Sequence, residues 1–341
     1  MKIFRYGLAA FVLLLSVCTA QTPQGYHLTK KILIGREGGW DYLSVDAAAR
    51  RLYVSRGDHV VVVNIDSNTV AGEISKTDGV HGIAVASEFG HGFTSNGRTS
   101  TVTMFDLKTL GVIKEIPVGK RPDAIIYDPA SKNIFTFNGG SDDATAVNAG
   151  SGIVTGTVAL GGRPESAAAD GQGHVYVNLE DKSEIAAIDS RTLTVTAHWN
   201  LSPGDSPSGL AIDSEHHLLF SGCHNDTMIV LDAENGHVLA ALPIGKGVDA
   251  CAFDAGAQCA FASCGDGTVT VVRCDNSPAA FSVLETVATQ RGARTMALDP
   301  VTHAFFVATA EFGPAPAPTP EHPRTRPAII PDTFVVLRFE K

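Results

Sequence analysis

Seven residues recur along the chain at a nearly constant spacing, each just ahead of a short apolar stretch. In chain order they are Asp41, His81, Asp123, Glu165, Ser208, Asp249 and Arg294, with spacings of 40, 42, 42, 43, 41 and 45 residues. Carboxylates and imidazole exchange protons and are ligands for hard or borderline divalent cations, so this pattern could serve a cation, a polar ligand or acid–base chemistry. We call these seven positions the ring.

Each ring residue belongs to a repeating unit. An apolar stretch and a turn are followed by a second stretch such as RLYVSR or HVYVNL, a third that ends in Asp, as in VTMFDLKT and IAAIDSRT, and a fourth such as VIKEIPVG. Alternating residues with turn signals every ~8–12 positions predict four antiparallel strands per unit. Seven such units predict an all-β fold, a seven-bladed β-propeller.

The turns and the chain ends refine this prediction. The Asp after the third strand is expected to accept backbone hydrogen bonds in the next turn, at Asp66, Asp106, Asp189 and Asp232. The seventh unit stops after three strands, whereas residues 28–35 form a spare strand before the first unit. We therefore expect the N-terminal strand to complete the last blade, within one propeller domain over residues 21–341.

Antiparallel order places the starts of the first strands and the loops between second and third strands on one face. The ring should therefore surround one mouth of the central channel, under a shallow polar cup. Residues expected in the cup are Arg56, Arg98, Asn138, Asn178 and His224. A proline-rich insertion in the seventh unit, residues 313–331, emerges on the same face and carries His322 toward the cup.

The ring admits a structural and a functional interpretation. In the first, the charges stay hydrated in a water-filled mouth and Arg294 pairs with Asp41 and Asp249. In the second, the ring binds a polar ligand or a divalent cation, with no specific cofactor motif. A metal-dependent hydrolase or lactonase would use His81 together with the ring carboxylates Asp41, Asp123 and Glu165. This requires that ligands on different blades lie close enough to share one ion. Phosphate loops, a G-x-S-x-G elbow and H-E-x-x-H are absent from the sequence.

The N-terminal segment predicts export. Lys2 and Arg5 lie at the start of the chain, an apolar run follows from Gly7 to Val17, and Ala20 precedes Gln21, as in a secretory signal peptide over residues 1–20. Lipid attachment at Cys18 is the disfavoured alternative, because Val17 stands where a small residue is expected. We predict a periplasmic or extracellular monomer without a transmembrane segment.

Charge and cysteine content restrict the partners further. Removing Lys2 and Arg5 leaves 24 Lys and Arg against 36 Asp and Glu, a formal charge of −12, which disfavours nucleic acid. The five cysteines beyond residue 20 are Cys223, Cys251, Cys259, Cys264 and Cys274. We expect small buried thiols, with a Cys259–Cys274 disulfide as the alternative if their strands form a hairpin.

The motifs LYVS, VYVN, VVVNIDSNT, IPVGKRPD and LPIGKGVD resemble the YVTN-repeat, YncE-like seven-bladed propellers of exported bacterial proteins. The resemblance covers essentially the whole chain after residue 20 and implies the fold. It implies no one function, because relatives have ligand, nucleic-acid, surface or redox-partner roles. From the residues we predict a binding module for a small polar ligand, a peptide or a protein partner, and hold the metal-dependent enzyme as the alternative.

Overall fold

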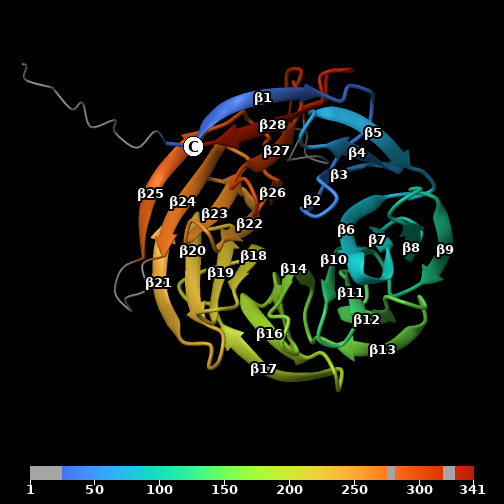
Figure 1. Ribbon diagram of the computed structural model, residues 1–341. Helices are drawn as coiled ribbons and strands as arrows, with labels where there is room; N and C mark the ends of the chain where they lie inside the picture. Colours follow the sequence, from blue (N-terminus) through green and yellow to red (C-terminus); the bar gives the residue numbers. More distant parts are fainter. Residues whose placement is uncertain (1–24, 275–280, 318–326) are drawn as a thin grey trace, which may run out of the picture.

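In the described residues, 25–274, 281–317 and 327–341, the computed structural model has 28 strands in seven antiparallel sheets of four strands each. The sheets are arranged as blades around a central axis (Figure 1). The predicted all-β, seven-bladed propeller is therefore confirmed. The signal peptide predicted over residues 1–20 lies outside the described residues.

Six blades are continuous in sequence, and the first three read as follows. Blade one is β2 (Leu43–Asp46), β3 (Arg51–Arg56), β4 (His59–Asn64) and β5 (Thr69–Ile74). Blade two is β6 (Val80–Ala86), β7 (His91–Asn96), β8 (Thr101–Asp106) and β9 (Val112–Pro117), with the 3-10 helix η1 (Ser87–Phe89) between its first two strands. Blade three is β10 (Pro122–Asp128), β11 (Asn133–Asn138), β12 (Asp143–Asn148) and β13 (Val154–Ala159).

The next three blades follow the same order. Blade four is β14 (Pro164–Ala169), β15 (His174–Leu179), β16 (Glu184–Asp189) and β17 (Thr194–Asn200). Blade five is β18 (Pro207–Asp213), β19 (Leu218–Cys223), β20 (Thr227–Asp232) and β21 (Val238–Pro243). Blade six is β22 (Val248–Asp254), β23 (Cys259–Cys264), β24 (Thr268–Cys274) and β25 (Phe281–Ala288).

Blade seven joins the two ends of the chain. It consists of β26 (Met296–Leu298), β27 (Phe305–Thr309), β28 (Val335–Glu340) and the N-terminal strand β1 (His27–Leu33). β1 pairs antiparallel with β28, with His27 opposite Glu340 and Leu33 opposite Val335. This confirms that the N-terminal strand closes the ring, which leaves no open seam between the first and last blades.

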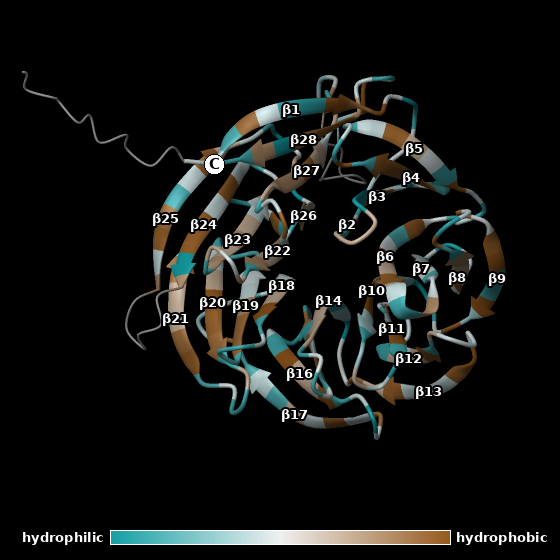
Figure 2. Ribbon diagram, in the orientation of Figure 1, coloured by the Kyte–Doolittle hydropathy of each residue, from teal (hydrophilic) through white to brown (hydrophobic). Residues whose placement is uncertain are grey.

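The hydrophobic core lies between adjacent blades. The second and third strands of each blade are buried on both faces, whereas outer strands such as β5, β9 and β17 are largely exposed. Figure 2 shows hydrophobic stretches along the blade strands. At the closure, Phe306 and Val336 of blade seven pack in one cluster with Leu52 and Val63 of blade one. This interlocking packing makes the propeller a rigid base for its loops.

The predicted Asp turns are present at three of four positions. Asp106, Asp189 and Asp232 accept backbone N–H bonds from the following turn at 2.7–3.0 Å. At Asp66 the prediction was wrong, because Asn64 accepts the turn bonds while Asp66 accepts from the Arg50 guanidinium.

Four of the five cysteines are buried and Cys251 is half-buried, and no disulfide joins Cys259 to Cys274. β23 and β24 do form a hairpin, but the Cys259 thiol lies 3.3 Å from the Ala257 carbonyl and the Cys274 thiol 3.7 Å from the Val272 carbonyl. Burial raises the pKa of Cys223 to about 11 and that of Cys264 to about 12, so neither is a reactive thiolate. No helix in the described part of the chain has the length and apolar character needed to cross a membrane.

Candidate functional site

The structure brings the ring together at one mouth of the central channel. Five ring residues are the second residue of an innermost strand, from β6 to β22, and the other two, Asp41 and Arg294, stand two residues ahead of β2 and β26. The regular spacing in the sequence therefore corresponds to register-equivalent places in space.

Hydrogen bonds between blades fix the backbone of the ring. The Ser95 hydroxyl of blade two donates to the carbonyl of Asp123 in blade three. The Ser263 hydroxyl of blade six does the same for Arg294 in blade seven. Because each bond links the second strand of one blade to the first strand of the next, the ring side chains start from fixed positions.

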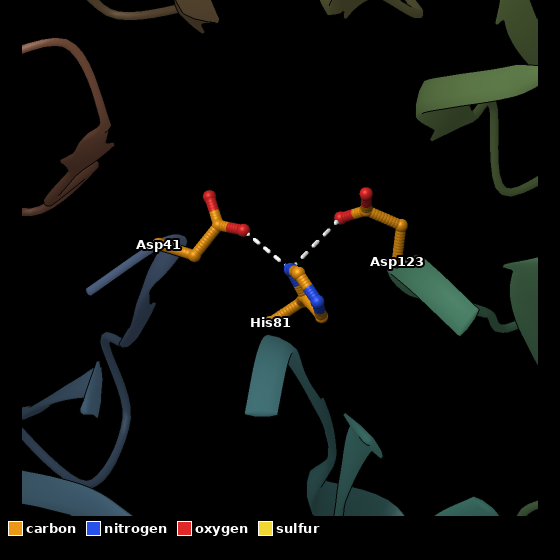
Figure 3. Close-up of side chains that lie close together, drawn as sticks. All are labelled: Asp41, His81 and Asp123. Carbon is orange, nitrogen blue, oxygen red and sulfur yellow. Dashed lines mark hydrogen bonds and ion pairs between the residues drawn. The ribbon is translucent and has the colours of Figure 1, made fainter. Parts of the chain in front are cut away.

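Three ring side chains converge on one point. His81 Nδ1 lies 2.5 Å from Asp41 Oδ2 and 3.5 Å from Asp123 Oδ1. Figure 3 shows the two carboxylates approaching the imidazole from either side, each from a different blade. The other edge of the imidazole is accommodated by Gly97, where a Cβ would lie 2.7 Å from His81 Nε2. Any larger residue at position 97 would force His81 to move.

The surroundings of this cluster raise the pKa values of His81 and Asp123. Burial lowers the pKa of His81, but the hydrogen bond to Asp41 and the charges of Asp123 and Glu165 outweigh it and raise the pKa to about 8. Burial, and then the charge of Asp41, raise the pKa of Asp123 to about 6, although His81 opposes the shift. The cluster therefore carries a protonated imidazole between carboxylates at neutral pH.

Glu165 is the fourth acidic member of this side of the mouth. It lines a 110 Å³ cavity with His81, Asp123 and the ion pair Arg163–Glu180, whose charged atoms are 2.5 Å apart. Burial and the charges of Asp123 and Glu180 raise the pKa of Glu165 to about 8. We call Asp41, His81, Asp123 and Glu165 the acidic sector.

The remaining ring residues lie on the other side of the mouth. Ser208 is 2% exposed and its hydroxyl lies 3.5 Å from the Asp249 carbonyl, so it faces the blade interface. Arg294 Nη1 is 3.5 Å from Asp249 Oδ1, which is one of its two predicted pairs. Among the described contacts, none joins Arg294 to Asp41.

Three residues expected in cup loops are instead buried in strands. Arg56 ends β3 and is 1% exposed; its guanidinium donates to five carbonyls of residues 35–39 and lies 3.9 Å over the Phe334 ring. Asn138 ends β11 and donates to Asp143 and Thr145.

Asn178 is the third of these buried residues. It lies in β15 and donates to the carbonyls of Ser208 and Gly209 at 2.9 and 3.1 Å, so it ties blade four to blade five. The misplacement of all three has one cause: neighbouring strands and loops cover the ends of the second strands, and the buried polar groups find their partners there. Arg98 and His224 are exposed in loops as predicted, while His322 lies outside the described residues.

The sequence analysis missed Tyr42, which follows the ring position of blade one. Its hydroxyl lies 3.4 Å from the Ser166 hydroxyl of blade four, so the side chain crosses the channel just below the acidic sector. Beneath it lies a 180 Å³ cavity lined largely by apolar residues such as Ile83 and Met296. A signal was present: the equivalent positions in other blades are small, at Gly82, Ala124, Ser166, Gly209, Ala250 and Thr295.

A larger pocket of 520 Å³ opens on the same face beside Asp249 and Arg294. Its other walls include Trp40, Arg291, Phe312 and Ile329. We call it the side pocket. Phe312 directly precedes the proline-rich insertion and Ile329 lies within it; the two residues pair through an isolated β-bridge, so the described ends of residues 313–331 lie at the side pocket.

The acidic sector offers donors for one cation. One ligand atom each from Asp41, His81 and Asp123 can be chosen so that all three lie within 4.8 Å of one another. Ligands on these three neighbouring blades are thus close enough to share an ion, whereas Glu165 does not join the group. Two carboxylates and an imidazole suit Mn²⁺ or Zn²⁺.

Comparisons with known proteins identify the fold. No protein-family model matches the chain, and no curated protein is similar enough to match. Among solved structures 1769 chains match, so the fold is too widespread to select a function. One is a chain in a crystal structure of the mitotic checkpoint complex, with a TM-score of 0.72 and 13% sequence identity over 88% of this chain and 95% of that chain. At that identity the similarity shows a WD40-like propeller fold and nothing more specific.

Proposed function

We propose that this chain is an exported binding protein that recognises a small ligand on the channel-mouth face. The observation that supports this proposal most strongly is the 520 Å³ side pocket, which is lined by two ring residues and by loops of the rigid propeller. Its volume falls in the range of about 300–1,000 Å³ that is usual for small-molecule sites. Propellers commonly act as interaction modules, as the solved structure of an assembly illustrates.

A thermal-shift screen of small ligands tests this function. Hits should lose their stabilisation in a variant that lacks residues 313–331 or in one that carries Asp123→Asn and Glu165→Gln. The matched control carries Glu215→Gln and Glu234→Gln, exposed carboxylates in the turns after β18 and β20 on the opposite face. Hits that are indifferent to both mouth variants would place binding elsewhere and reject the proposal.

A metal-dependent hydrolase or lactonase-like enzyme is the second candidate, favoured by the convergence of Asp41, His81 and Asp123. A bound cation would act as a Lewis acid and lower the pKa of a water molecule. These residues would hold it, with the remaining coordination open to the mouth.

Calorimetric titration of the purified protein with MnCl₂ and ZnCl₂ tests this candidate. We expect binding that Asp41→Asn with Asp123→Asn abolishes and that a control pair of exposed mouth-face carboxylates, Asp78→Asn with Asp142→Asn, preserves. Absence of binding, or equal binding to both double variants, would eliminate it.

We also infer export and kinship with the YVTN-repeat, YncE-like propellers. The support is the signal-like segment over residues 1–20 and the repeated LYVS- and VYVN-type motifs. Expression of the full chain in a bacterium should give a periplasmic product whose N-terminus is Gln21. A cytoplasmic product that retains Met1, or a lipidated product that begins at Cys18, would contradict this inference.

A further inference from the structure

The side pocket has a cationic wall. Arg291 is exposed at the pocket, and among the described residues its guanidinium has no hydrogen bond or ion pair. Arg294 is 38% exposed at the side chain and reaches Asp249 only at 3.5 Å, beyond the length of a strong charge-assisted bond. Among the described residues that line the pocket, two guanidiniums therefore face one carboxylate, an excess of one positive charge in an acidic protein.

A second wall of the pocket is aromatic and preformed. The Trp40 ring packs 6.2 Å from Phe312 and 5.0 Å from Phe334, measured between centroids. Phe312 is held by its bridge to Ile329 and lies against Gly292, where a Cβ would come within 2.7 Å of the ring. Gly292 has a φ of +83° and suits this close approach, since it has no side chain.

We propose that the side pocket binds a small organic anion with one carboxylate and a flat apolar body. The carboxylate would lie at Arg291 and Arg294, because the planar guanidinium matches a carboxylate in a two-pronged geometry. The apolar body would stack along Trp40 and Phe312. The described lining residues have one more positive than negative charge, which matches a singly charged anion better than a multiply charged one such as a nucleotide. This inference rests on the proposed function and specifies its ligand.

The first experiment uses 8-anilino-1-naphthalenesulfonate, an aromatic anion whose fluorescence rises in apolar sites, and displaces it with 2-naphthoate. We expect Arg291→Gln with Arg294→Gln to weaken 2-naphthoate at least tenfold. Arg191→Gln with Arg273→Gln removes the same charge from two exposed residues, one in the turn after β16 and one near the end of β24, and should change affinity less than twofold. The uncharged isostere 2-naphthamide should compete at least tenfold less well than 2-naphthoate.

A steric variant separates binding from folding. Gly39 lines the pocket, and a Cβ there would meet no atom within 4 Å. Gly39→Leu should therefore fill the space and abolish displacement by 2-naphthoate without lowering the melting temperature. The proposal is overturned if both arginine pairs behave alike, if the amide competes as well as the acid, or if Gly39→Leu binds normally.

Two further outcomes are decisive. A peptide with a free carboxyl terminus that binds more than tenfold tighter than 2-naphthoate would replace the small anion with a peptide partner. Hits from the thermal-shift screen that require Asp123 and Glu165 but ignore Arg291 and Arg294 would overturn this inference while the proposed function stands.

Discussion

The channel-mouth face has two halves, the acidic sector and the side pocket. Ring residues contribute to both halves, but the charge around them differs. The acidic sector adjoins a 110 Å³ cavity, where His81, Asp123 and Glu165 lie with Arg121 and Arg163, and the pKa values of His81 and Glu165 are raised to about 8. The side pocket encloses 520 Å³ between two guanidiniums and an aromatic wall. The scaffold thus sets where each ring residue starts, while the flanking residues decide what surrounds it.

Those flanking residues are departures from the repeat. Trp40 and Tyr42 stand on either side of the ring residue Asp41, where other blades have smaller residues. Trp40 builds the apolar wall of the side pocket, and Tyr42 closes the channel below the acidic sector. Both residues flank the ring position of blade one. Substitutions at this place in the chain can therefore test each half of the face separately.

The largest effect is expected from Arg56→Met, which should destabilise the half of the face that contains the side pocket. Arg56 holds residues 35–39, next to Trp40, through five carbonyl bonds, and without it the carbonyl of buried Gly35 and those of four exposed residues lose a charged donor. We expect the free energy of unfolding in urea to fall by about 4 kcal/mol, since a hydrogen bond to a charged group contributes about 1.5–3 kcal/mol and water replaces part of the bonds to the exposed carbonyls.

Arg98→Met is the matched control for this change. Arg98 is exposed in the loop between β7 and β8 of blade two, so its loss should cost no more than about 0.5 kcal/mol. Equal costs for the two variants would show that the carbonyl contacts of Arg56 contribute nothing to stability.

The next effect concerns the boundary below the acidic sector. Tyr42→Ala should cost about 2 kcal/mol, because truncating a large half-buried aromatic enlarges the 180 Å³ cavity that it lines. Tyr42→Phe keeps the ring and loses only a 3.4 Å contact with Ser166, so it should cost less than about 1 kcal/mol. If Tyr42→Ala is as stable as Tyr42→Phe by urea denaturation, the side chain does not close the channel.

The sequence was sufficient for the fold and for the ring, because both depend on a period that local strand and turn chemistry repeats seven times. It was insufficient for Arg56, Asn138 and Asn178, since burial at a strand end depends on the neighbouring blade. For Arg56 and Asn138 a signal existed in the repeats themselves: each is the last residue of a second strand, and that residue is Leu179, Cys223 or Cys264 in other blades. Apolar residues at an equivalent position indicate burial, and the polar residues there are buried with them.

The side pocket could not be predicted from the sequence, for a different reason. Arg291, Phe312 and Ile329 follow no repeat, and only the folded loops bring them to Trp40. The proline-rich insertion marked this place in the sequence, but neither its direction nor its partners follow from composition.

The smallest effect is a pH dependence that belongs to the acidic sector. The pKa values of His81 and Glu165, about 8, and of Asp123, about 6, are all raised above their ordinary values. Each group binds its proton more tightly in the folded chain than in the unfolded one. The folded state therefore holds more protons, and the free energy of unfolding must fall as pH rises from 5 to 8.

Glu165→Gln should flatten this pH dependence, because the amide neither titrates nor repels Asp123. We expect the loss of stability between pH 5 and 8 to shrink by about 1–2 kcal/mol, after a discount for the access of water to the cavity. Urea denaturation of protein treated with a chelator measures it. Glu215→Gln, on the opposite face, should leave the slope unchanged. A wild-type protein that gains stability from pH 5 to 8, or a Glu165→Gln variant with an unaltered slope, would show that the mouth carboxylates do not repel one another.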